Sequence, residues 1–93
     1  MSTRKATLAH ITGRVQGVGF RFWTQEEAEA LGLSGWVRNE PDGSVTALLV
    51  GPPGTIAEMI QKLQAGPPGA QVLQITAKPA DAGDPQNGFR ILR

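Results

Sequence analysis

Residues 6–21 read ATLAHITGRVQGVGFR, and the character of the chain changes twice along this stretch. Its first ten residues are rich in β-branched and apolar side chains, which predicts a strand. Two glycines, Gly17 and Gly19, then favour a loop, and helix-forming residues dominate over 20–31. The stretch therefore predicts a strand, a short glycine-containing loop and a helix in immediate succession.

Turn residues divide the rest of the chain into further elements. We expect strands over 34–39 and 44–50, a helix that starts near residue 55, a strand over 72–78 and a short last strand that includes Phe89 and Ile91. Thr55 and Glu58 have the spacing of a capping box, which places the start of the second helix at Thr55. In the fourth strand we expect Leu73, Ile75 and Ala77 to alternate toward one face.

The order of these elements is strand, helix, strand, strand, helix, strand, followed by the short last strand. Because strand-helix-strand units cross over right-handedly, two such halves give an antiparallel sheet with both helices on one face. This arrangement is the ferredoxin-like βαββαβ sandwich of the α+β class. We expect the strands that follow the two helices to flank the first strand, and residues 1–93 to form one domain.

The composition limits what the chain can bind. Nine Lys and Arg residues against eight Asp and Glu give a net charge of +1, so long-range attraction to nucleic acid or an anionic membrane is weak. The absence of Cys excludes disulfides and thiolate metal sites, and one His excludes sites that need several. We expect no metal, no cofactor and a monomer. No secretory signal or membrane-spanning run is visible, so the expected location is the cytoplasm.

The loop within residues 13–21 has the features of an anion-binding site. Gly17 and Gly19 allow positive φ angles and a close approach of the backbone to a ligand. Successive amides in such a loop can point inward, and the following helix start adds free N–H groups and a positive dipole end. Arg21 follows with a planar fork that suits phosphate oxygens. The alternative is a tight turn beside a solvated Arg21.

A second segment, residues 35–43, reads GWVRNEPDG and places Asn39 at the end of a strand. An Asn side chain carries both a donor and an acceptor, so it can hold and orient a water molecule. It can equally serve only to start the turn. Strand alternation directs Arg38 to the opposite face of the sheet. We expect His10 to be a packed or surface side chain, because it is remote in sequence from the glycine loop.

The two segments together resemble the signatures of the acylphosphatase family. Residues 11–21 read ITGRVQGVGFR, which is similar to the family pattern of an apolar residue followed by x-G-x-V-Q-G-V-x-F-R. Residues 35–39, followed by Gly43, Val45 and Gly51, are similar to G-W-V-x-N-x3-G-x-V-x5-G. The fixed positions of both patterns are all occupied, and the two occur in the family's order and spacing.

The resemblance implies hydrolysis of the carboxyl–phosphate bond of acyl phosphates to a carboxylate and inorganic phosphate. It implies that this occurs without a metal and without a covalent phosphoenzyme. It also implies that Asn39 orients the attacking water and that the Arg21 side chain holds the phosphoryl group. The backbone amides implied to share that role belong to Gln16, Gly17, Val18, Gly19, Phe20 and Arg21.

Three other functions are compatible with this fold. Similar domains open larger maturation proteins that handle carbamoyl phosphate, but those carry zinc-finger Cys clusters and this chain has no Cys. A nucleic-acid-binding sheet of the same topology needs aromatic residues on its central strands, and residues 6–15 and 72–78 contain none. A small-anion binding module without turnover stays open, because binding and hydrolysis would both use Arg21.

Overall fold

The computed structural model describes residues 4–83 and 88–92, which form five strands and two helices. The elements are β1 (Lys5–Arg14), α1 (Phe20–Ala30), β2 (Ser34–Asn39), β3 (Val45–Gly51), α2 (Pro53–Ala65), β4 (Gln71–Pro79) and β5 (Phe89–Leu92). The predicted order of elements is therefore confirmed, and the predicted bounds agree with the structure to within two residues.

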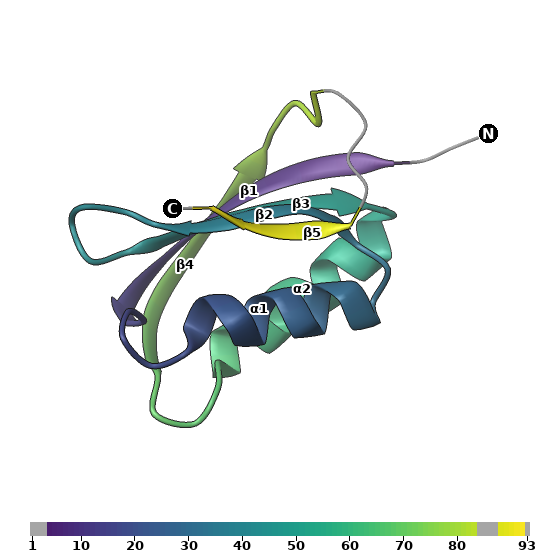
Figure 1. The fold of residues 1–93 in the computed structure, drawn as a ribbon. Helices are drawn as coiled ribbons and strands as arrows, with labels where there is room; N and C mark the ends of the chain where they lie inside the picture. Colours follow the sequence, from purple (N-terminus) through teal and green to yellow (C-terminus); the bar gives the residue numbers. More distant parts are fainter. Residues whose placement is uncertain (1–3, 84–87, 93) are drawn as a thin grey trace.

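The strands form one sheet in the order β4-β1-β3-β2-β5, and both helices cover the same face of it (Figure 1). Neighbouring strands are antiparallel except β2 and β5, which are parallel, so the short last strand makes the sheet mixed. The prediction that the strands after the two helices flank β1 is wrong for β2. Each helical crossover skips one strand position, and β3, which forms a hairpin with β2, fills the place beside β1.

The main core lies between the sheet and the helices. Alternate residues of the two central strands point into it, while the helices contribute residues spaced three and four apart. Full burial of one such apolar side chain is worth about 1.5–3 kcal/mol. The fully buried members include Ala9, Ile11, Val45, Ala47 and Leu49 from the strands, and Ala28, Met59 and Leu63 from the helices.

The start of α2 differs from the prediction. The helix begins at Pro53 with Pro52 as its N-cap, and no side chain makes a capping hydrogen bond. The Ile56 N–H donates to the Pro52 carbonyl at 3.0 Å, which closes the first turn. A proline in the first helical position has a preset φ and no N–H to cap, so the helix starts without a Thr55 capping box.

The fourth strand also differs from the prediction, because Leu73 is 74% exposed. The register between β1 and β4 shifts at Thr12 and Gly13, so that Gly13 pairs with Val72 and Leu73 becomes an extra residue. Val72 then packs against the core in the place expected for Leu73. At Gly13 a Cβ would lie only 2.1 Å from the Gln71 carbonyl oxygen, so this close approach requires glycine.

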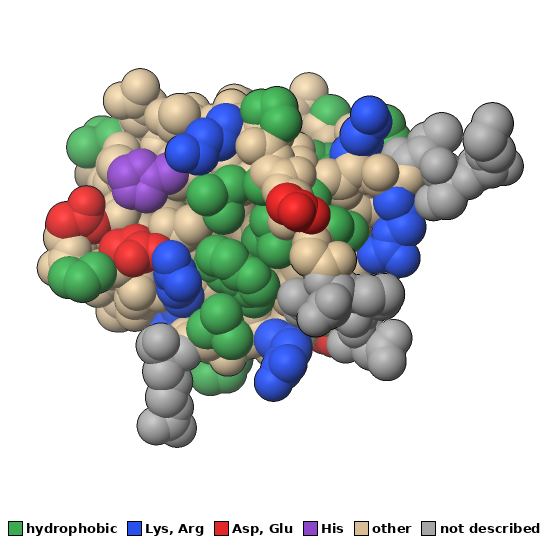
Figure 2. Space-filling model, turned by 90° about the horizontal axis from the view of Figure 1, so that it is seen from above, with side chains coloured by type: hydrophobic (Ala, Val, Ile, Leu, Met, Phe, Trp, Pro, Cys, Tyr) green, Lys and Arg blue, Asp and Glu red, His purple; other side chains and the backbone are tan. Residues whose placement is uncertain are grey.

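The face of the sheet away from the helices carries a smaller apolar cluster. Figure 2 shows this face from above, with apolar side chains at its centre and basic side chains around them. The buried members are Ala6, Leu48 and Val50, and Trp36 packs beside them. Arg38 reaches the same face, with its guanidinium carbon 4.8 Å from the centre of the Trp36 ring. The predicted direction of Arg38 is confirmed.

No helix in the described part of the chain is long and apolar enough to cross a membrane.

Candidate active site

The loop between β1 and α1 presents its backbone N–H groups without backbone partners. Within the described part of the chain, no N–H of residues 16–19 donates to a backbone carbonyl. Gly17 and Gly19 have φ angles of 74° and 76°, a conformation that side-chain-bearing residues rarely adopt. Gly19 is also the N-cap of α1, where no side chain caps the helix and no acidic residue occupies the first turn. The loop is therefore a ready cradle for an anion at the positive end of a helix.

Arg21 lies in the first turn of α1, and the C-terminal strand helps to orient it. One of its Nη atoms donates to the Leu92 carbonyl oxygen at 3.3 Å, across 71 residues of sequence. The remaining guanidinium N–H groups lie in the same plane, and this planar arrangement suits bidentate contact with phosphate oxygens. The role of the Leu92 carbonyl has no signal in the sequence, because any residue type supplies a carbonyl.

Asn39 ends β2 and has a buried side-chain oxygen that accepts no hydrogen bond from any described residue. A buried unpaired acceptor costs about 1–3 kcal/mol, so such an atom in a folded protein calls for an explanation. The turn does not provide one: Glu40 donates its N–H to the Ser44 carbonyl at 2.9 Å, and Gly43 donates to the Glu40 carbonyl at 3.2 Å. The Asn39 oxygen thus lacks a hydrogen-bond donor, which a small ligand such as water would supply on reaching that atom.

The loop and the end of β2 meet around a cavity of about 100 Å³. Both segments lie at the same end of the molecule (Figure 1). The structure thus brings together Arg21, Asn39 and most of the predicted loop residues, although Val18 does not line the cavity and its side chain packs against the core. The lining residues are Val15, Gln16, Gly17, Gly19, Phe20, Arg21, Phe22 and Asn39.

Two features at this cavity have no counterpart in the sequence-based prediction. Phe22 lines the cavity with 67% of its surface exposed, and its only sequence signal is an aromatic residue directly after the predicted phosphate-binding Arg21. The sequence motif suggested a role only for the backbone amide of Gln16. In the structure, the Gln16 side chain donates two hydrogen bonds to the β2–β3 hairpin.

The carboxylates nearest in sequence to Asn39 belong to the hairpin and do not line the cavity. Hydrogen bonds from the Ser44 hydroxyl and backbone N–H lower the pKa of Asp42. Hydrogen bonds from Arg38 and then Thr46 lower the pKa of Glu40. Both groups are therefore ionised near neutral pH, and no described Asp or Glu is placed to act as a general base in the cavity.

His10 is connected to this hairpin, although it is remote in sequence from the loop. Its Nε2 lies 2.8 Å from the Ser44 hydroxyl oxygen. Because that hydroxyl donates to Asp42, its oxygen accepts from the imidazole N–H. The expectation of a packed or surface His is thus refined: the ring anchors the hairpin to β1. Among the residues that the structure describes, no three His, Asp or Glu side chains gather as metal ligands.

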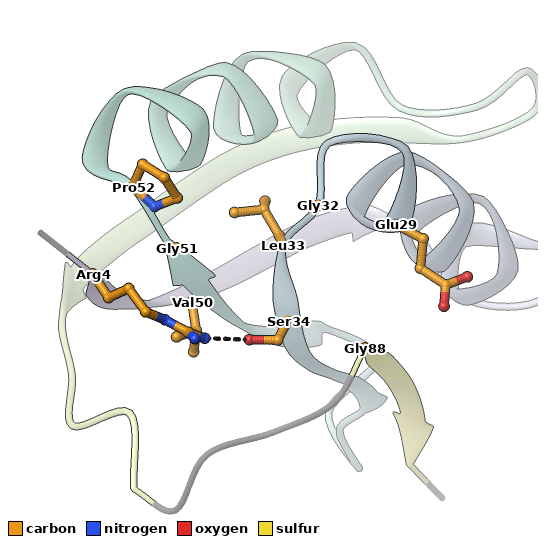
Figure 3. Close-up of a pocket in the computed structure, with 9 residues that line it drawn as sticks. All are labelled: Arg4, Glu29, Gly32, Leu33, Ser34, Val50, Gly51, Pro52 and Gly88. Atoms are coloured by element: carbon orange, nitrogen blue, oxygen red, sulfur yellow. Dashed lines mark hydrogen bonds between the residues drawn. The ribbon is translucent and has the colours of Figure 1, made fainter. Parts of the chain in front are cut away.

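A larger cavity of about 490 Å³ lies at the other end of α1, where Arg4, Glu29, Ser34 and Pro52 are among its lining residues (Figure 3). Arg4 is the one cation among the described residues that line it, and the other features of the cavity are unfavourable to a phosphoryl group. The C-terminal end of α1 turns its negative dipole end toward this region, and the Glu29 carboxylate adds negative charge. The start of α2 offers no amide at Pro52 or Pro53.

The fold and the small cavity together define a ferredoxin-like α+β protein with a loop of unpartnered amides at the start of α1. Residues 8–91 match the model of the acylphosphatase family. An acylphosphatase of Rhizobium meliloti (strain 1021) is 57% identical over 90 residues, which cover 97% of this chain and 95% of that protein. The crystal structure of acylphosphatase from Bacillus subtilis has a TM-score of 0.90 at 33% identity and covers 95% of this chain and 98% of that one.

A third similarity is to one part of a much longer protein. The structure of T. kodakarensis HypF matches with a TM-score of 0.86 at 29% identity, covering 96% of this chain but only 12% of HypF. The chain belongs to the acylphosphatase family. The resemblance noted in the two sequence segments is therefore confirmed, and the chain is a hydrolase of acyl phosphates.

Proposed function

We propose that the small cavity is where this chain hydrolyses acyl phosphates, with a division of labour between its two sides. The backbone amides of residues 16–21 and the Arg21 guanidinium bind the phosphoryl group, and Asn39 orients the attacking water. The observation that carries this proposal is that the unpartnered N–H groups of the loop and the unpartnered buried oxygen of Asn39 belong to two segments that line the same cavity. An anion satisfies the first, and a water that donates a hydrogen bond satisfies the second.

The chemistry needs little more than positioning and charge stabilisation. The water oxygen forms a bond to phosphorus while the bond between phosphorus and the acyl oxygen breaks, which releases a carboxylate and inorganic phosphate. Negative charge on the equatorial phosphoryl oxygens is met by amides and the Arg21 fork that are already in place. A carboxylate leaves readily without protonation, so no general acid is required.

The proton of the attacking water also needs an acceptor. Since no described carboxylate lines the cavity, we propose that a phosphoryl oxygen of the substrate accepts it. A pH dependence that traces to a protein carboxylate would contradict this part of the proposal. The proposed reaction uses neither metal nor cofactor.

A binding module without turnover is the second candidate, because the loop amides and Arg21 would hold an anion whether or not it reacts, and because a similar domain makes up only 12% of the longer HypF chain. Two observations weigh against it. The relative from Rhizobium meliloti is named an acylphosphatase and has nearly the same extent as this chain. Anion binding alone would use only the NH2 group of Asn39 and would leave its buried oxygen without a partner, because that oxygen and an anion are both acceptors. We also propose a cytoplasmic monomer that acts as one domain and binds no nucleic acid, consistent with its net charge of +1.

The direct test combines turnover with a map of phosphate binding. Benzoyl phosphate hydrolysis is followed by ultraviolet absorbance with EDTA present, and we expect sustained turnover. Inorganic phosphate is then titrated into labelled protein while the amide resonances are recorded. We expect the largest shifts at residues 16–21 and small ones at Arg4 and Ser34 beside the larger cavity. Phosphate binding without any turnover would favour the binding module, and shifts centred on the larger cavity would remove the proposed site.

A further inference from the structure

The side chain of Gln16 joins the phosphate-binding loop to the hairpin that carries Asn39. Its Nε2 donates to the Glu40 carbonyl at 2.9 Å and to the Ser44 carbonyl at 2.8 Å, across 24 and 28 residues of sequence. Both hydrogens of the amide are thereby used. Glu40 directly follows Asn39, and Ser44 directly precedes Val45, the residue that pairs with Asn39 across the hairpin. The two bonds therefore hold the first and last residues of the turn, next to Asn39 and next to its cross-strand partner Val45.

The hairpin does not need Gln16 to satisfy its own backbone. The Ser44 carbonyl also accepts from the Glu40 N–H, and the Glu40 carbonyl also accepts from the Gly43 N–H. Without the Gln16 amide, each carbonyl would keep one backbone partner, so the turn would stay closed. The hairpin is already tied to β1 through the β1–β3 ladder and His10, and the Gln16 amide adds a direct connection from the loop itself to the turn.

We propose that Gln16 is a positioning residue that sets the place of Asn39 relative to the bound phosphoryl group. This inference rests on the proposed function, in which Asn39 orients the water and the loop holds phosphate. In-line attack requires the water to lie on the far side of phosphorus from the leaving oxygen. A misplacement of about 1 Å can cost about 10²-fold in rate. Gln16 thus acts on turnover through Asn39, while phosphate binding depends on the loop backbone.

Replacement of Gln16 by Met tests this role, because Met keeps the length of the side chain but has no donor. We expect kcat for benzoyl phosphate to fall about 10-fold or more, with the inhibition constant of inorganic phosphate within about 2-fold of native. Gln16→Glu places an ionised acceptor against two carbonyls and should lower kcat at least as much. It also serves if the Met variant does not fold, since its side chain is polar.

Gln25 supplies the matched control. It is a half-buried Gln like Gln16, and its Nε2 donates to the Phe89 carbonyl at 2.9 Å, away from the hairpin. Gln25→Met loses the same kind of bond, so we expect a comparable change in melting temperature and a kcat within about 2-fold of native. Because β5 also orients Arg21, the inhibition constant of phosphate is measured for Gln25→Met as well; if Gln25→Met and Gln16→Met lower kcat equally with that constant unchanged, the effect of Gln16 is general loosening and the proposal is wrong.

A double variant separates this inference from the proposed function. If Gln16 acts through Asn39, then Gln16→Met combined with Asn39→Ala should be no slower than Asn39→Ala alone. Multiplied losses in the double variant would overturn the inference, as would a phosphate inhibition constant that rises as much as kcat falls. Failure of the proposed function has a different signature, because native protein would then show no turnover or Asn39→Ala would show no loss.

Discussion

The two ends of α1 differ in what they offer a ligand, and the smaller cavity is the better site. At the N-terminal end, loop amides and Arg21 surround about 100 Å³, and the buried Asn39 oxygen lacks a partner. At the C-terminal end, a cavity of about 490 Å³ is lined by Glu29, by Arg4, which donates to the Ser34 hydroxyl, and by Pro52, which lacks an N–H. Cavity volume therefore does not mark the site; unsatisfied donors and acceptors that match the reacting groups do.

Two arginines give the sharpest test of this comparison, because each of the two cavities is lined by one. Arg21→Ala should lower kcat/KM by about 10³-fold or more, since loss of one preorganised donor already costs about 10²–10³. Arg21→Lys should not restore it, because an ammonium cannot reproduce the planar fork. Arg4, which lines the larger cavity and donates to the Ser34 hydroxyl at 2.9 Å, is the control.

Steady-state kinetics with benzoyl phosphate, after circular dichroism shows that each variant folds, provide the measurement. We expect Arg4→Ala to stay within about 3-fold of native in kcat/KM, because its effect is on stability. A larger loss in Arg4→Ala than in Arg21→Ala would reverse the assignment of the two ends.

Asn39→Ala should separate catalysis from binding at the small cavity. We expect kcat to fall about 10²-fold while the phosphate inhibition constant stays within about 2-fold, because the loop amides and Arg21 remain. The melting temperature should be unchanged or higher, since the variant removes a buried acceptor whose lack of a partner costs about 1–3 kcal/mol. Calorimetry and inhibition by phosphate provide the measurements, and a parallel loss of phosphate binding would show that Asn39 holds the anion side of the site.

The sequence predicted the parts of this site that depend on local chemistry. A glycine loop between a strand and a helix predicts unpaired backbone amides whatever the tertiary packing. The place of Asn39 just before a turn makes it a candidate in the same way. The connections between distant segments could not be predicted. The Gln16 bonds to Glu40 and Ser44 depend on the packing of the hairpin against the loop, and the acceptors are carbonyls that every residue carries.

The same limit explains the errors in the fold. Alternation along the fourth strand predicts an inward Leu73, but the register shift opposite Gly13 depends on how closely two backbones approach. Likewise, the place of β3 beside β1 follows from crossovers that skip one strand position, which residue patterns along each strand do not encode.

Gly19 and Gly32 have nearly the same φ angle, so substitutions there compare the two ends of α1 through the main chain alone. Gly19 has a φ of 76° before the helix and Gly32 a φ of 73° after it, and an added Cβ meets nothing within 4 Å at either. Alanine at either position should cost about 1–2 kcal/mol of stability through backbone strain. Only Gly19→Ala should also weaken inhibition by phosphate, by about 10-fold, because the changed backbone conformation at residue 19 reorients the neighbouring loop N–H groups.

Urea unfolding and phosphate inhibition of the two alanine variants provide the measurements. If both variants weakened phosphate inhibition equally, strain would be spreading along α1. That result would contradict the role of the loop amides in phosphate binding.

Two buried serines, one near each cavity, provide the prediction with the smallest expected effect. The Ser44 hydroxyl near the catalytic end donates to Asp42 and accepts from His10, while the Ser34 hydroxyl at the other end accepts from Arg4. Ser44→Ala should raise the pKa of Asp42 toward its ordinary value, because the hydroxyl bond is the largest cause of the lowered pKa. The backbone bond from residue 44 remains, so the rise should be partial.

The pH dependence of stability follows from the direction of this shift. A carboxyl whose folded-state pKa is lowered stabilises the fold above its unfolded-state pKa, and that contribution is lost as pH falls through the folded-state pKa. Ser44→Ala brings the two pKa values of Asp42 together, so stability should fall less steeply in acid than it does in the native chain. Side-chain carbonyl NMR titration measures Asp42, and the pKa of Glu40 should move much less, because it depends first on Arg38 and Thr46 and only last on the charge of Asp42. If Ser34→Ala shifted Asp42 as much as Ser44→Ala does, a global change of structure would replace the local hydrogen bond as the cause.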